Sequence, residues 1–326
     1  MSRSQAMAVQ AGEATLAGTL TLPDLKPEAA GRVPAALLLP SWLPRTRDGA
    51  WDRAGHASWF APTRGEGPGL LARLAEALGR HGVASLRCDP RGCGESDGAW
   101  EAVSLFTRID DARDMLAAMR SHGSLDLRRF AIAGHGEGAT LALSVAIGDP
   151  AVSALTLIGP SARSWRDVLR RGVAERARTG TDLEHALVAA LDRVSEELLE
   201  RAERREATLR LHLRRGDSAE LQLAWVEQSI HTPPLALATM LHRSVGLVHG
   251  LRDAWSDAEE SALLEIALRD AGNQPSRRLL PNAGHDLAEA DDGVIDQIAA
   301  DLAARITAVE LPPVLVAIEE MGGDLR

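Results

Sequence analysis

The chain has 326 residues, of which 45% are hydrophobic, and carries a formal net charge of −10. This length allows one large α/β domain with an insertion, or two ordinary domains. The negative charge excludes a protein that binds nucleic acid by electrostatic attraction, because no basic field would draw in a phosphate backbone.

The two cysteines, Cys88 and Cys93, lie on one short segment and suggest no disulfide framework, so we expect a cytoplasmic protein. Residues 1–18 lack the apolar core of a signal peptide. No stretch of the sequence approaches the roughly 18 apolar residues of a membrane span, and we expect no membrane partner.

Apolar strand-like runs alternate with amphipathic helical runs in the first half of the chain. This pattern predicts a mostly parallel sheet with helices on both faces. Residues 14–23 alternate apolar and polar side chains, as an antiparallel edge strand does, whereas 34–40 is a continuous apolar run typical of a buried strand. The other expected elements are strands at 83–89, 129–134 and 151–159, and helices at 69–82 and 108–123.

The pattern changes from Ser161 to about Arg243, where the chain is charge-rich and helical without convincing strands. Strands are expected again at 244–250 and 275–284, with helices at 256–271 and 291–308. A helical insertion between two parts of one sheet predicts a cap over its carboxyl edge, where ligands bind in open α/β folds; a separate helical domain is the alternative. The expected parts are the first part of the core (1–160), the cap (161–243), the second part of the core (244–312) and a C-terminal tail (313–326).

The segment IAGHGEGAT, residues 132–140, places a tight turn between an expected strand and an alanine-rich helical stretch. Many hydrolases mount a nucleophilic serine on such a turn. Here the central residue is Gly136, which has no side chain and cannot attack a substrate.

The chain resembles the α/β-hydrolase superfamily, in particular its capped serine hydrolases, over nearly its whole length apart from the cap and the termini. The resemblance is carried by residues 71–98, which end in CDPRGCGESDG, and by FTRIDDARDML followed by GHGEG. It implies an α/β-hydrolase fold with a G-x-S-x-G nucleophile elbow. Four residues fit that motif: Gly134, His135, Glu137 and Gly138. Gly136, at the position of the serine, departs from it.

The resemblance also implies the acid and the base of a catalytic triad. Asp253, in LVHGLRDAW, follows a late strand where the family has its acid, and His285, in PNAGHDL, follows the last strand where the family has its base. In such a pair the buried carboxylate holds the imidazole ring and its tautomer while the histidine gains a proton.

The loop that should form the oxyanion hole departs from the family too. Relatives have a glycine-rich loop there, whose backbone N–H groups face the developing oxyanion, but this chain has Ser41, Trp42 and Leu43. Such side chains restrict the backbone, so we expect a remodelled hole with the N–H of Glu137 as the remaining donor. We expect neither Ser41 nor Cys93 to replace the nucleophile, because nothing in the sequence places a base beside them.

Tryptophan supplies most of the flat aromatic surface, with seven Trp, three Phe and no Tyr. Indole rings stack on planar ligands, which predicts a bulky, hydrophobic, polycyclic or polyunsaturated substrate. Packing of the loop tryptophans between cap and core is the alternative. The expected substrate-binding residues are Ser41, Trp42, Trp100, His135, Gly136, Glu137 and Trp255.

A His–Asp pair without a covalent partner can still move protons between substrate atoms. We therefore expect a non-hydrolytic enzyme of natural-product biosynthesis, in which His285 and Asp253 catalyse C–C bond formation by intramolecular or conjugate addition, cyclisation or isomerisation. Two alternatives stay open: hydrolysis by a water that His285 activates, and a non-catalytic binding or scaffolding protein. The sequence shows no metal-ligand cluster and no dinucleotide-binding glycine motif, so we expect no cofactor and no metal; a homodimer stays open.

Overall fold

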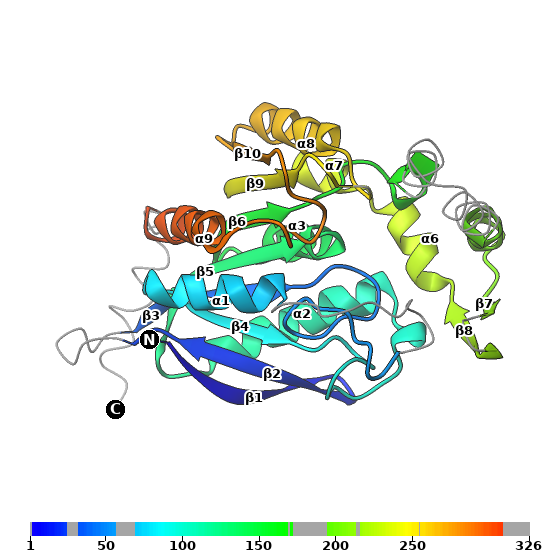
Figure 1. Ribbon diagram of the computed structural model, residues 1–326, viewed down its shortest axis with the longest axis horizontal. Coiled ribbons are helices and arrows are strands. Elements are labelled where there is room, and N and C mark those ends of the chain that lie inside the picture. Colours follow the sequence, from blue (N-terminus) through cyan, green and yellow to red (C-terminus); the bar gives the residue numbers. More distant parts are fainter. Residues whose placement is uncertain are drawn as a thin grey trace.

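In the computed structural model the described residues are 2–24, 32–56, 69–168, 170–171, 194–212, 216–253 and 255–308. Among them, eight strands form the central sheet, in the order β1-β2-β4-β3-β5-β6-β9-β10 (Figure 1). These strands are β1 (Arg3–Ala11), β2 (Ala14–Leu22), β3 (Val33–Leu39), β4 (Ala84–Cys88), β5 (Leu125–His135), β6 (Val152–Ile158), β9 (Ser244–Gly250) and β10 (Ser276–Leu280).

All neighbouring strands from β4 to β10 are parallel, whereas β2 is antiparallel to both of its neighbours. The antiparallel character expected for 14–23 is confirmed, but its place at the edge is wrong. The edge strand beside it is β1, which the sequence did not reveal because most of its residues face solvent and only Val9 and Ala11 are buried.

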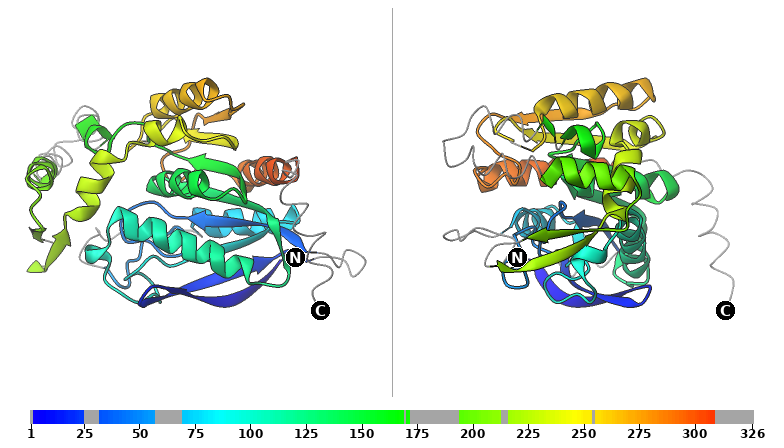
Figure 2. Two further views of the ribbon diagram at one scale, coloured as in Figure 1. Left: turned by 180° about the vertical axis from the view of Figure 1, so that it is seen from behind. Right: turned by 90° about the vertical axis from the view of Figure 1, so that its right-hand side faces the viewer.

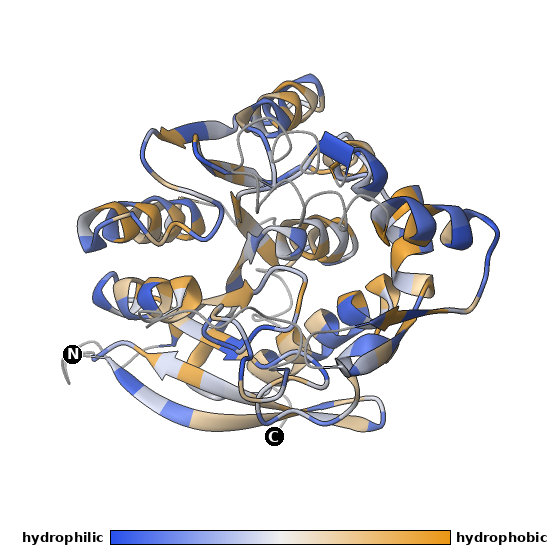
Figure 3. Cartoon of the chain, turned by 45° about the vertical axis from the view of Figure 1, so that its right-hand side comes forward, coloured by the Kyte–Doolittle hydropathy of each residue, from blue (hydrophilic) through white to orange (hydrophobic). Residues whose placement is uncertain are grey.

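Helices cover both faces of the sheet, which confirms the predicted fold class. On one face α1 (Leu70–Arg80) packs against α9 (Asp292–Thr307), and the other face carries α2 (Leu105–Arg120), α3 (Glu137–Gly148) and α8 (Ala258–Asp270) (Figure 2). Each face buries its own hydrophobic core, to which both the strands and the helices contribute hydrophobic residues (Figure 3). Within the described part of the chain, no helix combines the length and the apolar character that crossing a bilayer requires.

The segment expected to be a helical cap is only partly helical. It contains a helix at 194–203, α6 (Ala224–His231) and α7 (Pro234–Ala238), but also a hairpin of β7 (Thr208–His212) and β8 (Ser218–Gln222). The expectation of no strands is therefore wrong. Each strand buries one leucine, Leu209 opposite Leu221, and the charged residues between them concealed this short alternation. Residues 172–193 of the expected cap and the expected tail lie outside the described residues.

Candidate active site

The backbone of the nucleophile elbow is intact although its central residue is glycine. Strand β5 ends at His135, helix α3 begins at Glu137, and Gly136 between them has φ 56° and ψ −118°. A Cβ on Gly134 would overlap the carbonyl of Gly138, and a Cβ on Gly138 would lie 2.8 Å from the carbonyl oxygen of Pro40. The two flanking glycines therefore allow the strand, the helix and the neighbouring loop to meet at this tight turn.

The space next to Gly136, where a side chain at this position would lie, is filled by another residue. A Cβ on Gly136 would overlap the hydroxyl of Ser41, lie 2.8 Å from the Cβ of Ser41 and lie 3.0 Å from Nε2 of His285. Ser41 belongs to the loop that follows β3 and is 8% exposed. Its side chain occupies the position that a side chain at residue 136 would take.

The structure brings the predicted acid and base together. Nδ1 of His285 lies 2.7 Å from Oδ2 of Asp253, whose other oxygen accepts the N–H groups of Trp255 at 2.8 Å and Ser256 at 2.9 Å. Burial disfavours the carboxylate, but the charge and hydrogen bond of His285, with these two N–H groups, outweigh it and hold the pKa of Asp253 below its ordinary value. A charged Asp253 fixes the ring so that Nε2 faces the elbow.

Gly159 is a residue of this site that the sequence analysis missed. It follows β6 with φ +54°, and a Cβ there would lie 3.1 Å from Nδ1 of His285 and 3.2 Å from Oδ2 of Asp253. A side chain at this position would press its Cβ against both partners of the pair, and the positive φ favours glycine. The available signal was a glycine directly after an apolar strand, where a close backbone approach is common.

His135 lies behind the pair and has no exposed surface. Its Nε2 is 3.0 Å from the carbonyl oxygen of His285, to which a neutral ring donates a hydrogen bond, and the two imidazole centroids are 4.6 Å apart. Burial, with the nearby charge of His285, lowers the pKa of His135 to about 3. We propose that His135 supports the loop of His285, in place of the expected contact with substrate.

The side chain of Glu137 joins three elements. Its carboxylate pairs with the buried guanidinium of Arg108 on α2 and accepts the indole N–H of Trp225 on α6. Arg108 also donates to the carbonyl oxygen of Pro40 at 3.4 Å. A carboxylate held in this way is not a free acid. The backbone N–H of Glu137, as the first of α3, has no acceptor within the helix, and its role as the oxyanion donor stays a prediction.

Four tryptophans pack against one another between the loop after β3 and the cap. The rings of Trp42 and Trp225 are stacked at 4.1 Å with an interplanar angle of 7°. Trp100 and Trp165 lie against Trp42, with centroids 5.4 and 5.5 Å away. This packing corresponds to the alternative in which the tryptophans join cap to core.

Trp255 differs from this cluster, because it is 39% exposed and adjoins the loop of Asp253. Trp51 lies beneath the guanidinium of Arg45 at 3.7 Å, and Trp59 lies outside the described residues. Substrate contact by Trp42, Trp100 and Trp255 stays a prediction, and the exposed indole has the surface to make it.

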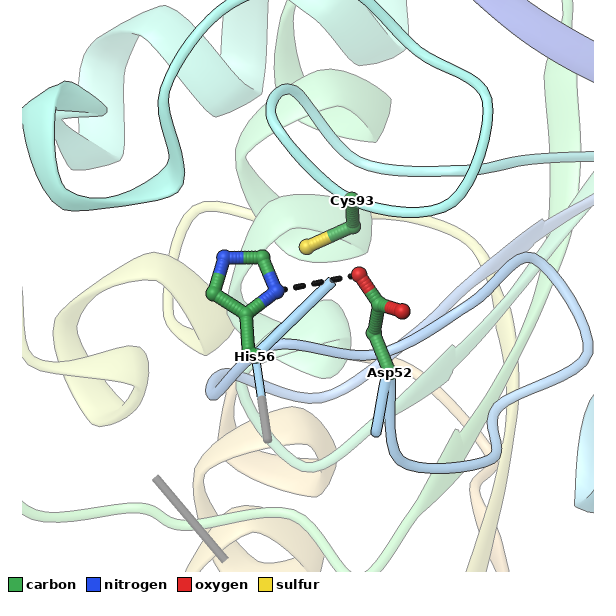
Figure 4. Close-up of side chains that lie close together, drawn as sticks. All are labelled: Asp52, His56 and Cys93. Atoms are coloured by element: carbon green, nitrogen blue, oxygen red, sulfur yellow. Dashed lines mark hydrogen bonds and ion pairs between the residues drawn. The ribbon is translucent and has the colours of Figure 1, made fainter. Parts of the chain in front are cut away.

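A second group of side chains could hold a metal ion. Asp52, His56 and Cys93 are buried together, with their ligand atoms within 4.8 Å of one another (Figure 4). Nδ1 of His56 lies 3.0 Å from Asp52, which also accepts the N–H of Gly94 at 3.1 Å. A base therefore lies beside Cys93, contrary to expectation, but burial with the charge of Asp52 raises the pKa of this thiol to about 12. We assign this group as a cross-link between two loops.

Comparison with known proteins gives a family match and many similar folds. A family model described as serine aminopeptidase, S33, matches residues 60–291. No curated protein sequence matches the chain.

Three solved structures illustrate the shared fold, each at 18% sequence identity. Ferulic acid-bound Est1E from Butyrivibrio proteoclasticus has a TM-score of 0.61, with 91% of this chain and 99% of that one covered. The esterase domain of a Rhodothermus marinus protein has a TM-score of 0.58, with 94% and 99% covered. The α/β hydrolase GrgF from Penicillium sp. sh18 has a TM-score of 0.60, with 95% and 100% covered.

Proposed function

Because the chain belongs to the serine aminopeptidase S33 family, within the α/β-hydrolase superfamily, we propose that it hydrolyses an acyl compound of the carboxylic ester type. The observation that carries this proposal is the pair of His285 and Asp253, bonded at 2.7 Å, with Nε2 of His285 facing an intact elbow. The names of two similar structures, an esterase domain and Est1E bound to ferulic acid, support ester chemistry.

In this reaction His285 is the acid and base. Its Nε2 takes the proton of the hydroxyl group, of the protein or of water, that attacks the carbonyl carbon of the substrate. The charge of Asp253 stabilises the imidazolium that results. The carbonyl oxygen becomes negative and faces the N–H of Glu137, at the positive end of the α3 dipole. The imidazolium then returns its proton to the departing alcohol.

The substitution His285→Ala tests this role. We expect turnover of aryl and alkyl esters to fall at least about 10³-fold while the thermal transition is kept, because general acid–base catalysis is lost. His242→Ala, at an exposed histidine before β9, should retain activity. If His285→Ala turned over esters like the unchanged chain, the pair would be structural. If the unchanged chain turned over no ester, hydrolysis would be contradicted and a binding or scaffolding protein would remain.

Non-hydrolytic chemistry is the second candidate, favoured by the missing side chain at Gly136. The elbow itself cannot form an acyl-enzyme, and the same pair could catalyse C–C bond formation, cyclisation or isomerisation of a planar hydrophobic intermediate. The half-exposed ring of Trp255 offers a surface for stacking such a ligand. Turnover in ¹⁸O-labelled water separates the candidates, since hydrolysis places one solvent oxygen in the product and the other reactions place none.

A further inference from the structure

The chain departs from the family pattern at two positions: glycine replaces serine at one of them, and serine replaces glycine at the other. The elbow has glycine, Gly136, where the G-x-S-x-G motif has serine. The loop after β3 has serine, Ser41, where a glycine-rich loop is the family pattern. In the structure these positions meet, because a Cβ on Gly136 would overlap the Ser41 hydroxyl. The serine and the glycine have in effect exchanged places across one small space.

We propose that Ser41 is the nucleophile of this enzyme and carries the acyl group during turnover. This inference rests on the proposed hydrolytic function and adds a covalent intermediate to it. It also replaces the expectation that Ser41 is an ordinary loop serine, which was based on the absence of a visible base. The fold supplies that base from His285, 244 positions along the chain.

The position of the hydroxyl suits this role. The point where a Cβ of residue 136 would lie touches Ser41 on one side and is 3.0 Å from Nε2 of His285 on the other. Among the described residues, no hydrogen bond engages the Ser41 hydroxyl, and this includes a hydrogen bond to Nε2 of His285. Catalytic hydrogen bonds in unliganded enzymes are commonly long and tighten when substrate binds.

The loop that carries Ser41 is fixed on both sides of this residue. On one side the carbonyl of Pro40 accepts a hydrogen bond from buried Arg108. On the other side Trp42 is stacked on Trp225 of the cap at 4.1 Å. A nucleophile on a loop needs such restraint, because a displacement of about 1 Å can lower a rate about 10²-fold.

The same room also argues against a free water as the nucleophile above Gly136. A water molecule there would have to share the space that Ser41 fills. The crowding that excludes a side chain at residue 136 therefore favours attack by the protein hydroxyl.

The covalent steps balance as in other serine hydrolases. Oγ of Ser41 forms a bond to the carbonyl carbon and gives its proton to Nε2 of His285. The C–O bond to the alcohol breaks, and the alcohol leaves with that proton. Water then attacks the ester on Ser41 and gives a proton to His285, which returns it to Oγ as the acid is released. The N–H of Glu137 faces the oxyanion in both steps.

An alkyl fluorophosphonate tests the proposal independently of turnover, because attack forms an O–P bond and releases fluoride. The tryptic peptide 33–45, VPAALLLPSWLPR, contains Ser41 as its one hydroxyl residue, so mass spectrometry of the labelled full chain locates the adduct. We expect one adduct, on this peptide, that is lost in Ser41→Ala and forms at least about 10²-fold more slowly in His285→Ala. Ser121→Ala, at the C-terminal end of α2, should label like the unchanged chain.

The outcomes separate this inference from the proposed function. An adduct on another residue, or no adduct in a chain whose ester turnover depends on His285, would overturn Ser41 as the nucleophile and leave hydrolysis standing. An adduct on Ser41 in a chain that hydrolyses no ester would support the nucleophile and contradict the function.

Exchange of the two residues gives a second, stricter test. Gly136→Ser alone should be poorly tolerated, because its Cβ would overlap Ser41, and Ser41→Gly alone should lose labelling at least about 10²-fold. The double variant Ser41→Gly/Gly136→Ser relieves the overlap, and we expect the adduct to move to position 136. Labelling that persists in Ser41→Gly alone would contradict the proposal.

Discussion

The closeness of His285 and Asp253 depends on a residue that makes no hydrogen bond through a side chain. Gly159 borders both partners of the pair, and its φ of +54° suits glycine better than any other residue. Its missing Cβ is as much a part of the site as the two side chains that face it.

The substitution Gly159→Ala should displace the imidazole, because the new Cβ would lie 3.1 Å from Nδ1 of His285. We expect kcat for ester hydrolysis to fall about 10- to 100-fold, with a stability loss of about 1–3 kcal/mol from the left-handed backbone. Gly272→Ala is the matched control, since this glycine has φ +86° and a Cβ there meets nothing within 4 Å. A normal kcat in Gly159→Ala would show that the pair does not need this approach.

Residue by residue, the sequence predicted the pair of Asp253 and His285, but not that the hydroxyl of Ser41 lies at the elbow, on the Nε2 side of His285. Asp253 and His285 follow strands in family-like contexts, so their positions could be inferred from local pattern. The role of Ser41 depends on where the backbone of its loop places one oxygen relative to residues 95 and 244 positions away. No local sequence pattern gives that distance. In the sequence, the glycine at the elbow and the serine in the loop after β3 therefore look like two independent losses, of the nucleophile and of the oxyanion loop.

At the scale of elements, the cap and the core meet through Trp225 of α6. Its ring stacks on Trp42 of the loop after β3, and its N–H bonds Glu137 at the start of α3. One side chain therefore joins the cap to the loop that bears Ser41 and to the start of α3. The helices and central strands were predictable from periodicity, whereas the β7–β8 hairpin of the cap was not, because its strands are short and charged.

Two substitutions of Trp225 separate its two contacts. Trp225→Phe keeps a ring but removes the N–H donor, and we expect a loss of about 1–3 kcal/mol in the free energy of unfolding. Trp225→Ala also removes the stack and should lose about 3–5 kcal/mol, with a fall in turnover because the Ser41 loop loses its support. Guanidinium denaturation measures both, with the exposed Met240→Ala as control. Equal, small losses in both Trp225 variants would contradict a joining role.

At the scale of the whole molecule, buried neutral histidines make stability depend on pH. Burial lowers the pKa of His249, and it lowers that of His135 to about 3, where the charge of His285 adds to burial and outweighs the attraction of Asp286. In the unfolded chain these groups titrate near 6.5. Between about pH 6.5 and the folded values, unfolding takes up protons, so the free energy of unfolding must fall as the pH is lowered.

The substitution His135→Gln isolates one such contribution, because the amide can still donate to the carbonyl of His285 but does not titrate. We expect the unchanged chain to lose up to about 1.4 kcal/mol per pH unit more than this variant between about pH 6 and pH 4, since one proton is taken up on unfolding. Urea denaturation at a series of pH values measures the difference. His242→Ala should follow the unchanged chain, because that imidazole is exposed in both states. Parallel pH profiles for the unchanged chain and His135→Gln would contradict the lowered pKa of His135. The ring would then be protonated in the folded protein, and the donor to the carbonyl of His285 would be an imidazolium in place of a neutral imidazole.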